Sequence, residues 1–313
     1  MKEITPQLTD ALKRHFTDSV ARQEAYPVGS YDELMRIVAE LSYLNRDNLL
    51  FFRGQAKDFR NKAGSTTLYP SLYRKNLITK ARLEYDFALL KEISALLIEE
   101  TKKYDRRAAD EIRRKQYIQW SLIQHYGVFE TPLLDITQSL RVACSFAQLE
   151  EGGMGSGDGS PCYVYILGLP YMPNGISINS EQEIVNLRLL GACPPLALRP
   201  YFQEGFLVGT ADITDNFDDK NELDFNRRLI AKFSIPGDDS FWNGNLGRVP
   251  RELLYLDEAK DTMHRICSSL HGAVLKTEDM LFDADEYAAE VETLTIKLRL
   301  RLSQRLSLRL GRK

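Results

Sequence analysis

Two kinds of hydrophobic periodicity are segregated along this chain, and the segregation restricts the fold more than any other feature. Residues 78–104 repeat apolar side chains at helical spacing, and residues 106–125 indicate another helix. Three later segments are rich in the β-branched and aromatic residues typical of strands: CYVYILGLP (162–170), EGFLVGT (204–210) and RRLIAKFSIP (227–236). A helical N-terminal half followed by a strand-rich second half predicts an α+β fold rather than a doubly wound α/β sheet.

The composition is typical of a soluble globular protein. Of the 313 residues, 43% are hydrophobic and 27% charged, which suits one large domain or two small ones. No uncharged apolar run approaches the ~18 residues that a membrane span needs, and no apolar segment follows the first lysine. The four cysteines form no C-x-x-C pair. We therefore expect a cytoplasmic protein without a membrane span.

The stretch LLFFRGQ, residues 49–55, predicts a short strand that is buried on both faces. Arg53 would emerge where this strand leaves the sheet, and a partly buried guanidinium needs a partner. Before the strand, residues 7–24 predict an amphipathic helix, and a second helix is expected from Ser30 to about Leu44. The sequence S-Y-D-E at Ser30 has the order of a capping box.

Two polar segments suggest where the chain divides. The Gly- and Ser-rich residues 152–161 predict a surface loop, and residues 236–247 predict a boundary. The expected division is a helical N-terminal lead at 1–27, a central domain at 28–236, and a C-terminal helical extension at 237–313.

Five short blocks carry a resemblance to a known family. In chain order they are FFRGQ, YPSLYR (69–74), QWSLIQHYG (119–127), TPLLDITQSLRVACSFA (131–147) and PYFQEGFLV (200–208). The blocks resemble those of the FRG domain family, named for its Phe-Arg-Gly motif, and the resemblance implies a single FRG-type domain. The chain departs from the family pattern where Pro132 stands in place of an Arg and Ile136 in place of a Trp.

The arrangement of these blocks also resembles, more loosely, the ADP-ribosyltransferases of the arginine-serine-glutamate class. That resemblance implies an NAD-dependent enzyme that uses NAD as its substrate without a metal, and that acts as a toxin or in conflict with phage. Arg53 would then grip the dinucleotide phosphates, Thr137 and Ser139 would supply hydroxyl groups, and Gln203 or Glu204 would be the late polar group.

Four further residues are candidates for substrate binding. Tyr69 and Arg74 belong to an aromatic and basic cluster that could stack on a base. His125 lies at the centre of its family block, and Asp135 lies in the LLDIT block. We expect Arg53, His125, Asp135, Ser139 and Gln203 to converge on one cleft, because strand ends and helix ends are common places for a site.

A non-catalytic module that binds a nucleotide, a nucleic acid or a protein is the alternative function. Each candidate also has a structural interpretation. Arg53 would pair with Asp135, Thr137 would be a helix N-cap, Gln203 would be a hydrogen-bonding strut, and His125 would cap a helix end. A Glu that faces Arg53 across a cleft would favour catalysis, whereas a Gln alone would favour binding.

Two features near the C-terminus remain. His264, Cys267 and His271 would share one helix face, which fits either three metal ligands or a partly buried face. Residues 295–313 contain seven basic and no acidic residues, so the rest of the chain has 34 basic against 44 acidic, a net of −10. This tail alternates basic and apolar residues. It would bind nucleic acid, lie on an acidic membrane surface, dock on the domain itself, or remain disordered.

Overall fold

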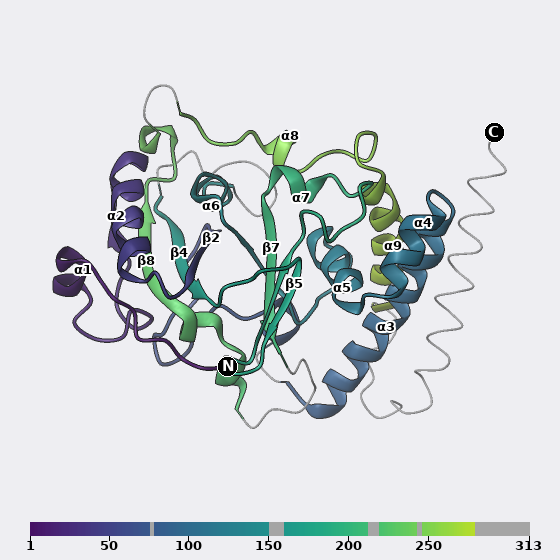
Figure 1. Ribbon diagram of the computed structural model, residues 1–313, viewed down its shortest axis with the longest axis horizontal. Coiled ribbons are helices and arrows are strands. Elements are labelled where there is room, and N and C mark those ends of the chain that lie inside the picture. The colour runs from purple at the N-terminus through teal and green to yellow at the C-terminus, as the bar shows by residue number, and fades with distance from the viewer. Residues whose placement is uncertain (76–77, 150–159, 212–218, 243–245, 279–313) are drawn as a thin grey trace.

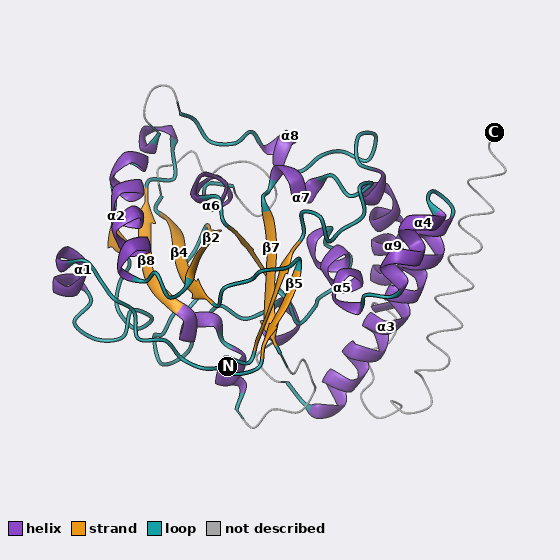
Figure 2. Ribbon diagram, in the orientation of Figure 1, coloured by secondary structure: helices purple, strands orange, loops and turns teal. Residues whose placement is uncertain are grey.

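One mixed sheet with helices at both ends makes up the fold of the computed structural model (Figures 1 and 2). The structure describes residues 1–75, 78–149, 160–211, 219–242 and 246–278. Helices α1 (Asp10–His15) and α2 (Tyr31–Leu44) lie at one end of the sheet (Figure 1). The helices at the other end are α3 (Lys80–Lys102), α4 (Arg106–Arg113), α5 (Gln116–His125) and α9 (Thr262–Glu278). The prediction of an α+β fold is confirmed.

The sheet has the strand order β1-β8-β4-β2-β3-β7-β6-β5 within the described residues. Its neighbouring strands are antiparallel except for β1 and β8, which are parallel. The bounds are β1 (Tyr26–Pro27), β2 (Leu49–Gln55), β3 (Leu134–Thr137), β4 (Cys162–Leu169), β5 (Ile176–Asn179), β6 (Ile184–Arg188), β7 (Gly205–Thr210) and β8 (Leu229–Ile235). The four strands predicted from apolar runs are thus present as β2, β4, β7 and β8, and LLFFRGQ is a central strand.

Two hydrophobic cores hold the helices against this sheet. The first joins α2 and α6 (Leu140–Ala147) to β2, β4 and β8. The second joins the helices at the other end to β6 and β7: α3 (Lys80–Lys102), α5 (Gln116–His125) and α9 (Thr262–Glu278). Helix α4 (Arg106–Arg113) packs on α3, and the short helices α7 (Arg199–Phe202) and α8 (Arg251–Leu254) contact each other near the start of β7.

The N-terminal helices only partly follow the sequence prediction. Ser30 caps α2 as expected, since its hydroxyl accepts a hydrogen bond from the Glu33 amide at 3.3 Å. The helix predicted over residues 7–24 is wrong beyond His15. Thr17 and Gln23 hydrogen-bond to each other there and close a turn, which competes with helix in the way that short polar side chains do.

Several predicted segments lie outside the described residues, namely the basic tail 295–313 and most of the Gly- and Ser-rich loop. Among the helices that the structure does describe, not one combines the length and apolar character required for crossing a membrane.

Candidate functional site

The Phe-Arg-Gly motif lies in the middle of the sheet, on β2. Gly54 is required there, because a Cβ atom at this position would lie 1.9 Å from the Ala143 carbonyl oxygen and 2.6 Å from the Ala147 amide nitrogen. Both atoms belong to the backbone of α6, so this helix approaches β2 more closely than any side chain allows. Phe52, two residues earlier on the same face of the strand, is buried in the first core.

Arg53 is partly buried and holds its charge without a carboxylate partner. Its Nη1 donates a hydrogen bond of 2.6 Å to the backbone carbonyl oxygen of Asp135, while its Nε is enclosed and has no acceptor. Among the described residues, no carboxylate forms an ion pair with it. The expected tie between Arg53 and the LLDIT block therefore exists, but the structural interpretation that gave Arg53 the Asp135 carboxylate is wrong.

Electrostatics distinguish this guanidinium from an ordinary surface arginine. Burial, and then the positive charge of Arg74, lower the pKa of Arg53 to about 10, against the opposing effect of Asp135. Arg53 therefore remains protonated at neutral pH, although its surroundings disfavour the charge.

The Asp135 carboxylate is held by α5. Gln124 Nε2 donates to its Oδ2 at 2.7 Å, and His125 Nδ1 lies 3.2 Å from its Oδ1. A carboxylate only accepts, so this contact places a proton on Nδ1. Burial by itself would raise the pKa of Asp135, but these hydrogen bonds, with the charges of His125 and Arg53, lower it.

The His125 ring packs directly on the backbone of β7. Its Nε2 is enclosed without a hydrogen-bond partner, and a Cβ atom on Gly205 would lie 3.2 Å from its Cε1. The sequence analysis expected the His125 ring to cap the end of its own helix. In the structure the ring instead contacts the Asp135 carboxylate.

Tyr69 and Arg74 lie next to this centre. Arg74 is exposed, donates from Nε to the Tyr69 carbonyl oxygen at 3.1 Å, and lies near enough to Arg53 to affect its pKa. The ring of Tyr69 already has the Lys220 ammonium 4.7 Å from its centroid. Stacking of this ring on a base therefore stays a prediction.

The hydroxyl groups of the LLDIT block make structural hydrogen bonds. Thr137 Oγ1 donates towards the carbonyl oxygens of Gln203 and Glu204, at 3.0 and 3.1 Å, and accepts from the Ser139 amide at 3.0 Å. The N-cap of α6 is Ser139, whose hydroxyl accepts from the Val142 amide, so the prediction of Thr137 as the cap is wrong.

Gln203 and Glu204, the candidates for the late polar group, have different surroundings. Gln203 is buried, and its Nε2 donates to the Leu254 carbonyl oxygen at 2.6 Å, which fits the strut interpretation. Glu204 is exposed and has a left-handed φ of 44°. Its charge contributes to the raised pKa of Tyr31, for which burial is the main cause.

The sheet brings the family blocks onto three adjacent strands. Phe52 on β2 pairs with Thr137 on β3, and Thr137 pairs with Gly205 on β7. Direct contacts join Arg53 to Asp135, Asp135 to His125, and Thr137 to the backbone of Gln203. The convergence of five side chains on one cleft stays a prediction.

A buried arginine that the sequence analysis missed completes the surroundings. Arg199 Nη1 donates to the His125 carbonyl oxygen at 3.0 Å, and its guanidinium lies 4.7 Å from the ring centroid of Tyr126 and 5.4 Å from that of Tyr255. The Asp261 carboxylate accepts from the Tyr126 hydroxyl and from the Arg199 amide. The position of Arg199 directly before the PYFQEGFLV block was the available signal.

The proposed metal ligands of α9 make other contacts. His264 Nδ1 is 2.6 Å from the Leu256 carbonyl oxygen, and His271 Nδ1 is 3.3 Å from that of Val128. Cys267 is buried between them, and burial raises the pKa of its thiol. No cluster of potential metal ligands occurs within the described part of the chain.

A scan against known families agrees with the motif at the centre of this site. The FRG domain model matches residues 48–152, which run from β2 past the end of α6 and include Arg53, His125 and Asp135. Searches among curated proteins and among solved structures find no match. The family match supports the assignment of this segment to the FRG domain family.

Proposed function

We propose that the FRG-type domain binds the phosphate groups of a nucleotide at a cationic centre formed by Arg53 and Arg74. The observation that carries this proposal is the state of Arg53: a guanidinium held by a carbonyl oxygen, with an unpartnered Nε and with no ion pair to a carboxylate in the described part of the chain. Burial and Arg74 both lower its pKa, so a bound anion would relieve an unfavourable charge. A planar guanidinium is also well suited to phosphate oxygens.

Thermal melting in the presence of graded anions tests this proposal. Inorganic phosphate, ADP, ADP-ribose and NAD should raise the melting temperature of the wild type, because a ligand that binds only the folded state stabilises it. At a ligand concentration of 100 times Kd the gain is about 2.7 kcal/mol. An unchanged melting temperature with all four ligands at millimolar concentration contradicts the proposal.

Substitutions separate a ligand-binding role from a structural one. Arg53→Lys should lose the ligand-induced shift almost as fully as Arg53→Ala, because an ammonium group cannot reproduce a two-pronged contact. Arg74→Gln should weaken the shift, and Arg36→Gln, which changes an exposed arginine of α2, should leave it unchanged. If Arg53 serves only to hold β3, both Arg53 variants should instead lose about 2 kcal/mol of stability, the value for a hydrogen bond from a charged donor.

NAD-dependent ADP-ribosyl transfer is the second candidate function. It is favoured by the arrangement of the Arg, Thr/Ser and Gln-Glu blocks on the adjacent strands β2, β3 and β7. In this proposal NAD is the substrate, Arg53 holds its phosphates, and the protein acts on a macromolecule as a toxin or in conflict with phage. Because Gln203 donates its amide to Leu254, Glu204 is the residue of this block left to orient the nicotinamide ribose.

Release of nicotinamide from NAD is the assay for this candidate. Wild-type protein should release nicotinamide, and Glu204→Gln should reduce the rate by at least a hundredfold if the carboxylate stabilises the developing charge. Glu40→Gln, at an exposed position of α2, is the matched control. Phosphate-dependent stabilisation without nicotinamide release would support the binding module and reject the transferase.

A further inference from the structure

Basic residues are concentrated in the segment that runs from the end of α3 through α4 to the start of α5, at the opposite end of the molecule from α2 (Figure 1). Residues 102–115 contain seven basic and three acidic residues, a net of +4, although the whole chain has a net charge of −3. The remaining residues therefore carry −7. All seven basic side chains are exposed: Lys102, Lys103, Arg106, Arg107, Arg113, Arg114 and Lys115.

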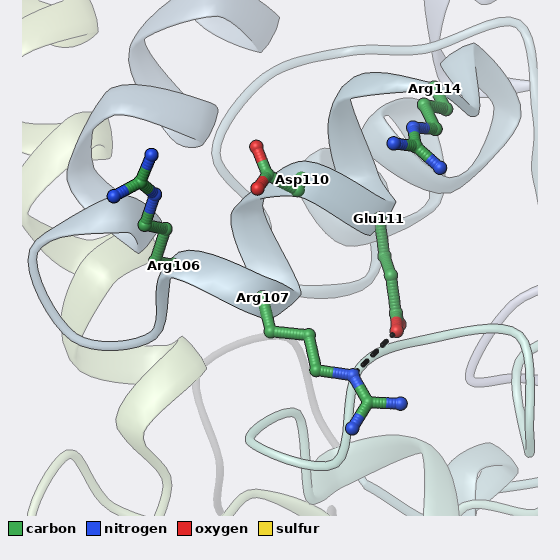
Figure 3. A pocket seen from close by; sticks show the side chains of 5 residues that line it. All are labelled: Arg106, Arg107, Asp110, Glu111 and Arg114. Carbon is green, nitrogen blue, oxygen red and sulfur yellow. Dashed lines mark hydrogen bonds and ion pairs between the residues drawn. The ribbon is translucent and has the colours of Figure 1, made fainter.

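Helix α4 presents its own basic residues on one side because its other side is packed. Ala108, Ala109 and Ile112 are buried. The outer side is hollowed into a space of about 450 Å³ lined by Arg106, Arg107, Asp110, Glu111 and Arg114 (Figure 3). Figure 3 shows Arg106 and Arg114 towards opposite ends of this lining.

The acidic residues of the segment are already engaged. Asp110 pairs with Arg113 at 2.9 Å, and Glu111 pairs with Arg107 at 3.4 Å. The Asp105 carboxylate caps α4 by accepting from the Ala108 amide at 3.0 Å. Within the part of the chain that the structure describes, Arg106 and Arg114 have no ion-pair partner, so these two arginines are available to an external anion.

An exposed aromatic residue lies two positions before Arg106 in the sequence. Tyr104 is 52% exposed and lies in the turn directly before α4. Exposed aromatic rings next to basic side chains are typical of proteins that bind single-stranded nucleic acid, in which bases stack on the rings and arginines hold the phosphates. An acidic protein partner would not need such a ring.

We propose that Tyr104, Arg106 and Arg114 form a surface that binds single-stranded nucleic acid. Arg106 and Arg114 are eight residues apart, which corresponds to about 12 Å along a helix axis. At about 3.4 Å of rise per nucleotide in one strand, the two guanidinium groups span three to four nucleotides. This surface acts independently of the Arg53 centre.

Binding of a fluorescein-labelled single strand of about 20 nucleotides to the full-length protein tests the proposal. Arg106→Gln with Arg114→Gln should reduce the slope of log affinity against log salt by about 1.4, since each phosphate contact on a single strand contributes about 0.7. Tyr104→Leu should weaken binding about fivefold or more and leave the slope unchanged, because stacking releases no counterions.

Helix α2 offers matched controls at the other end of the molecule (Figure 1). Tyr43 is 71% exposed and has the Arg46 guanidinium 5.6 Å from its ring centroid. Two variants remove the same kinds of side chain there: Tyr43→Leu, and the double variant Arg36→Gln with Arg46→Gln. Neither should change the affinity for the strand or the slope of log affinity against log salt.

Three results would overturn the proposal. One is an equal effect of the α2 and α4 substitutions, which would assign binding to charge in general. Another is competition by polyglutamate as effective as that by unlabelled strand, which would point to an acidic protein. The third is tighter binding of a duplex than of a single strand. Melting curves of all variants confirm that each is folded.

Discussion

Replacement of Gly54 by alanine gives the most direct test of the contact between α6 and the sheet. The new methyl group would lie 1.9 Å from the Ala143 carbonyl oxygen, 2.6 Å from the Ala147 amide nitrogen and 2.9 Å from the Ala143 carbonyl carbon. All three are backbone atoms, so no side chain can rotate away and the helix itself must move. Overpacking of a core costs about 1–3 kcal/mol where side chains can adjust. We expect Gly54→Ala to lose at least 3 kcal/mol of unfolding free energy.

Urea unfolding followed by circular dichroism measures this loss as a shift of the midpoint at constant m. Gly247→Ala is the matched control, because a Cβ atom there meets nothing within 4 Å. It should be neutral or stabilising by up to about 1 kcal/mol. Ala143→Gly should fail to rescue Gly54→Ala, since it removes a methyl group and leaves the carbonyl oxygen in place. A Gly54→Ala protein within 0.5 kcal/mol of the wild type would refute the reasoning.

Three further predictions concern buried polar groups. Burial raises the pKa of the Asp224 carboxyl to about 6, so the protonated carboxyl stabilises the folded state. This contribution to the free energy of unfolding is complete below the unfolded pKa near 3.8 and is lost as pH rises through 6. Asp224→Asn should therefore flatten the fall in urea stability between pH 4 and 7, a change of about 3 kcal/mol for about two pKa units. Tyr126→Phe removes a 2.7 Å hydrogen bond to the buried Asp261 carboxylate and should cost about 2 kcal/mol in the same assay, and a neutral variant would contradict this estimate. Lys232→Met leaves Asp58 short of one partner and should cost about 3 kcal/mol, whereas equal stability would show that the pair contributes nothing.

Local pattern was sufficient to predict the elements that are buried on both faces. The segments that became β2, β4, β7 and β8 are short runs of apolar residues, and such runs have few alternatives in a folded chain. The capping residue Ser30 is equally local, because its partner is three residues away. These predictions depend on periods and spacings that neighbouring residues determine.

The strand order and the partners of the site residues could not be predicted, because they depend on contacts between distant segments. Arg53 and Asp135 are 82 residues apart, and the acceptor is a carbonyl oxygen, which every residue possesses. The hydrogen bond from Gln203 to the Leu254 carbonyl oxygen likewise depends on the position of α8 in the fold. Side-chain chemistry alone therefore favoured a carboxylate for Arg53 and left the role of Gln203 open.

The geometry of β2 helps to explain why Arg53 forms no ion pair with the described residues. Successive side chains of a strand point to opposite faces, so α6, which requires Gly54 on one face, leaves Arg53 on the other, in register with Tyr165 and Lys232.

Both carboxylates nearest to this row are committed elsewhere. Asp58 accepts from the Tyr165 hydroxyl at 3.0 Å, lies 3.4 Å from Lys232 Nζ, and pairs with Arg60 at 2.8 Å. Asp135 gives its two oxygens to Gln124 and His125. Arg53 is thus left with a backbone carbonyl oxygen, which accepts a hydrogen bond but carries no net charge. Among the described residues Asp135 acts on this charge only from beyond ion-pair distance, so a direct ionic contact to Arg53 would have to come from an anion in solution.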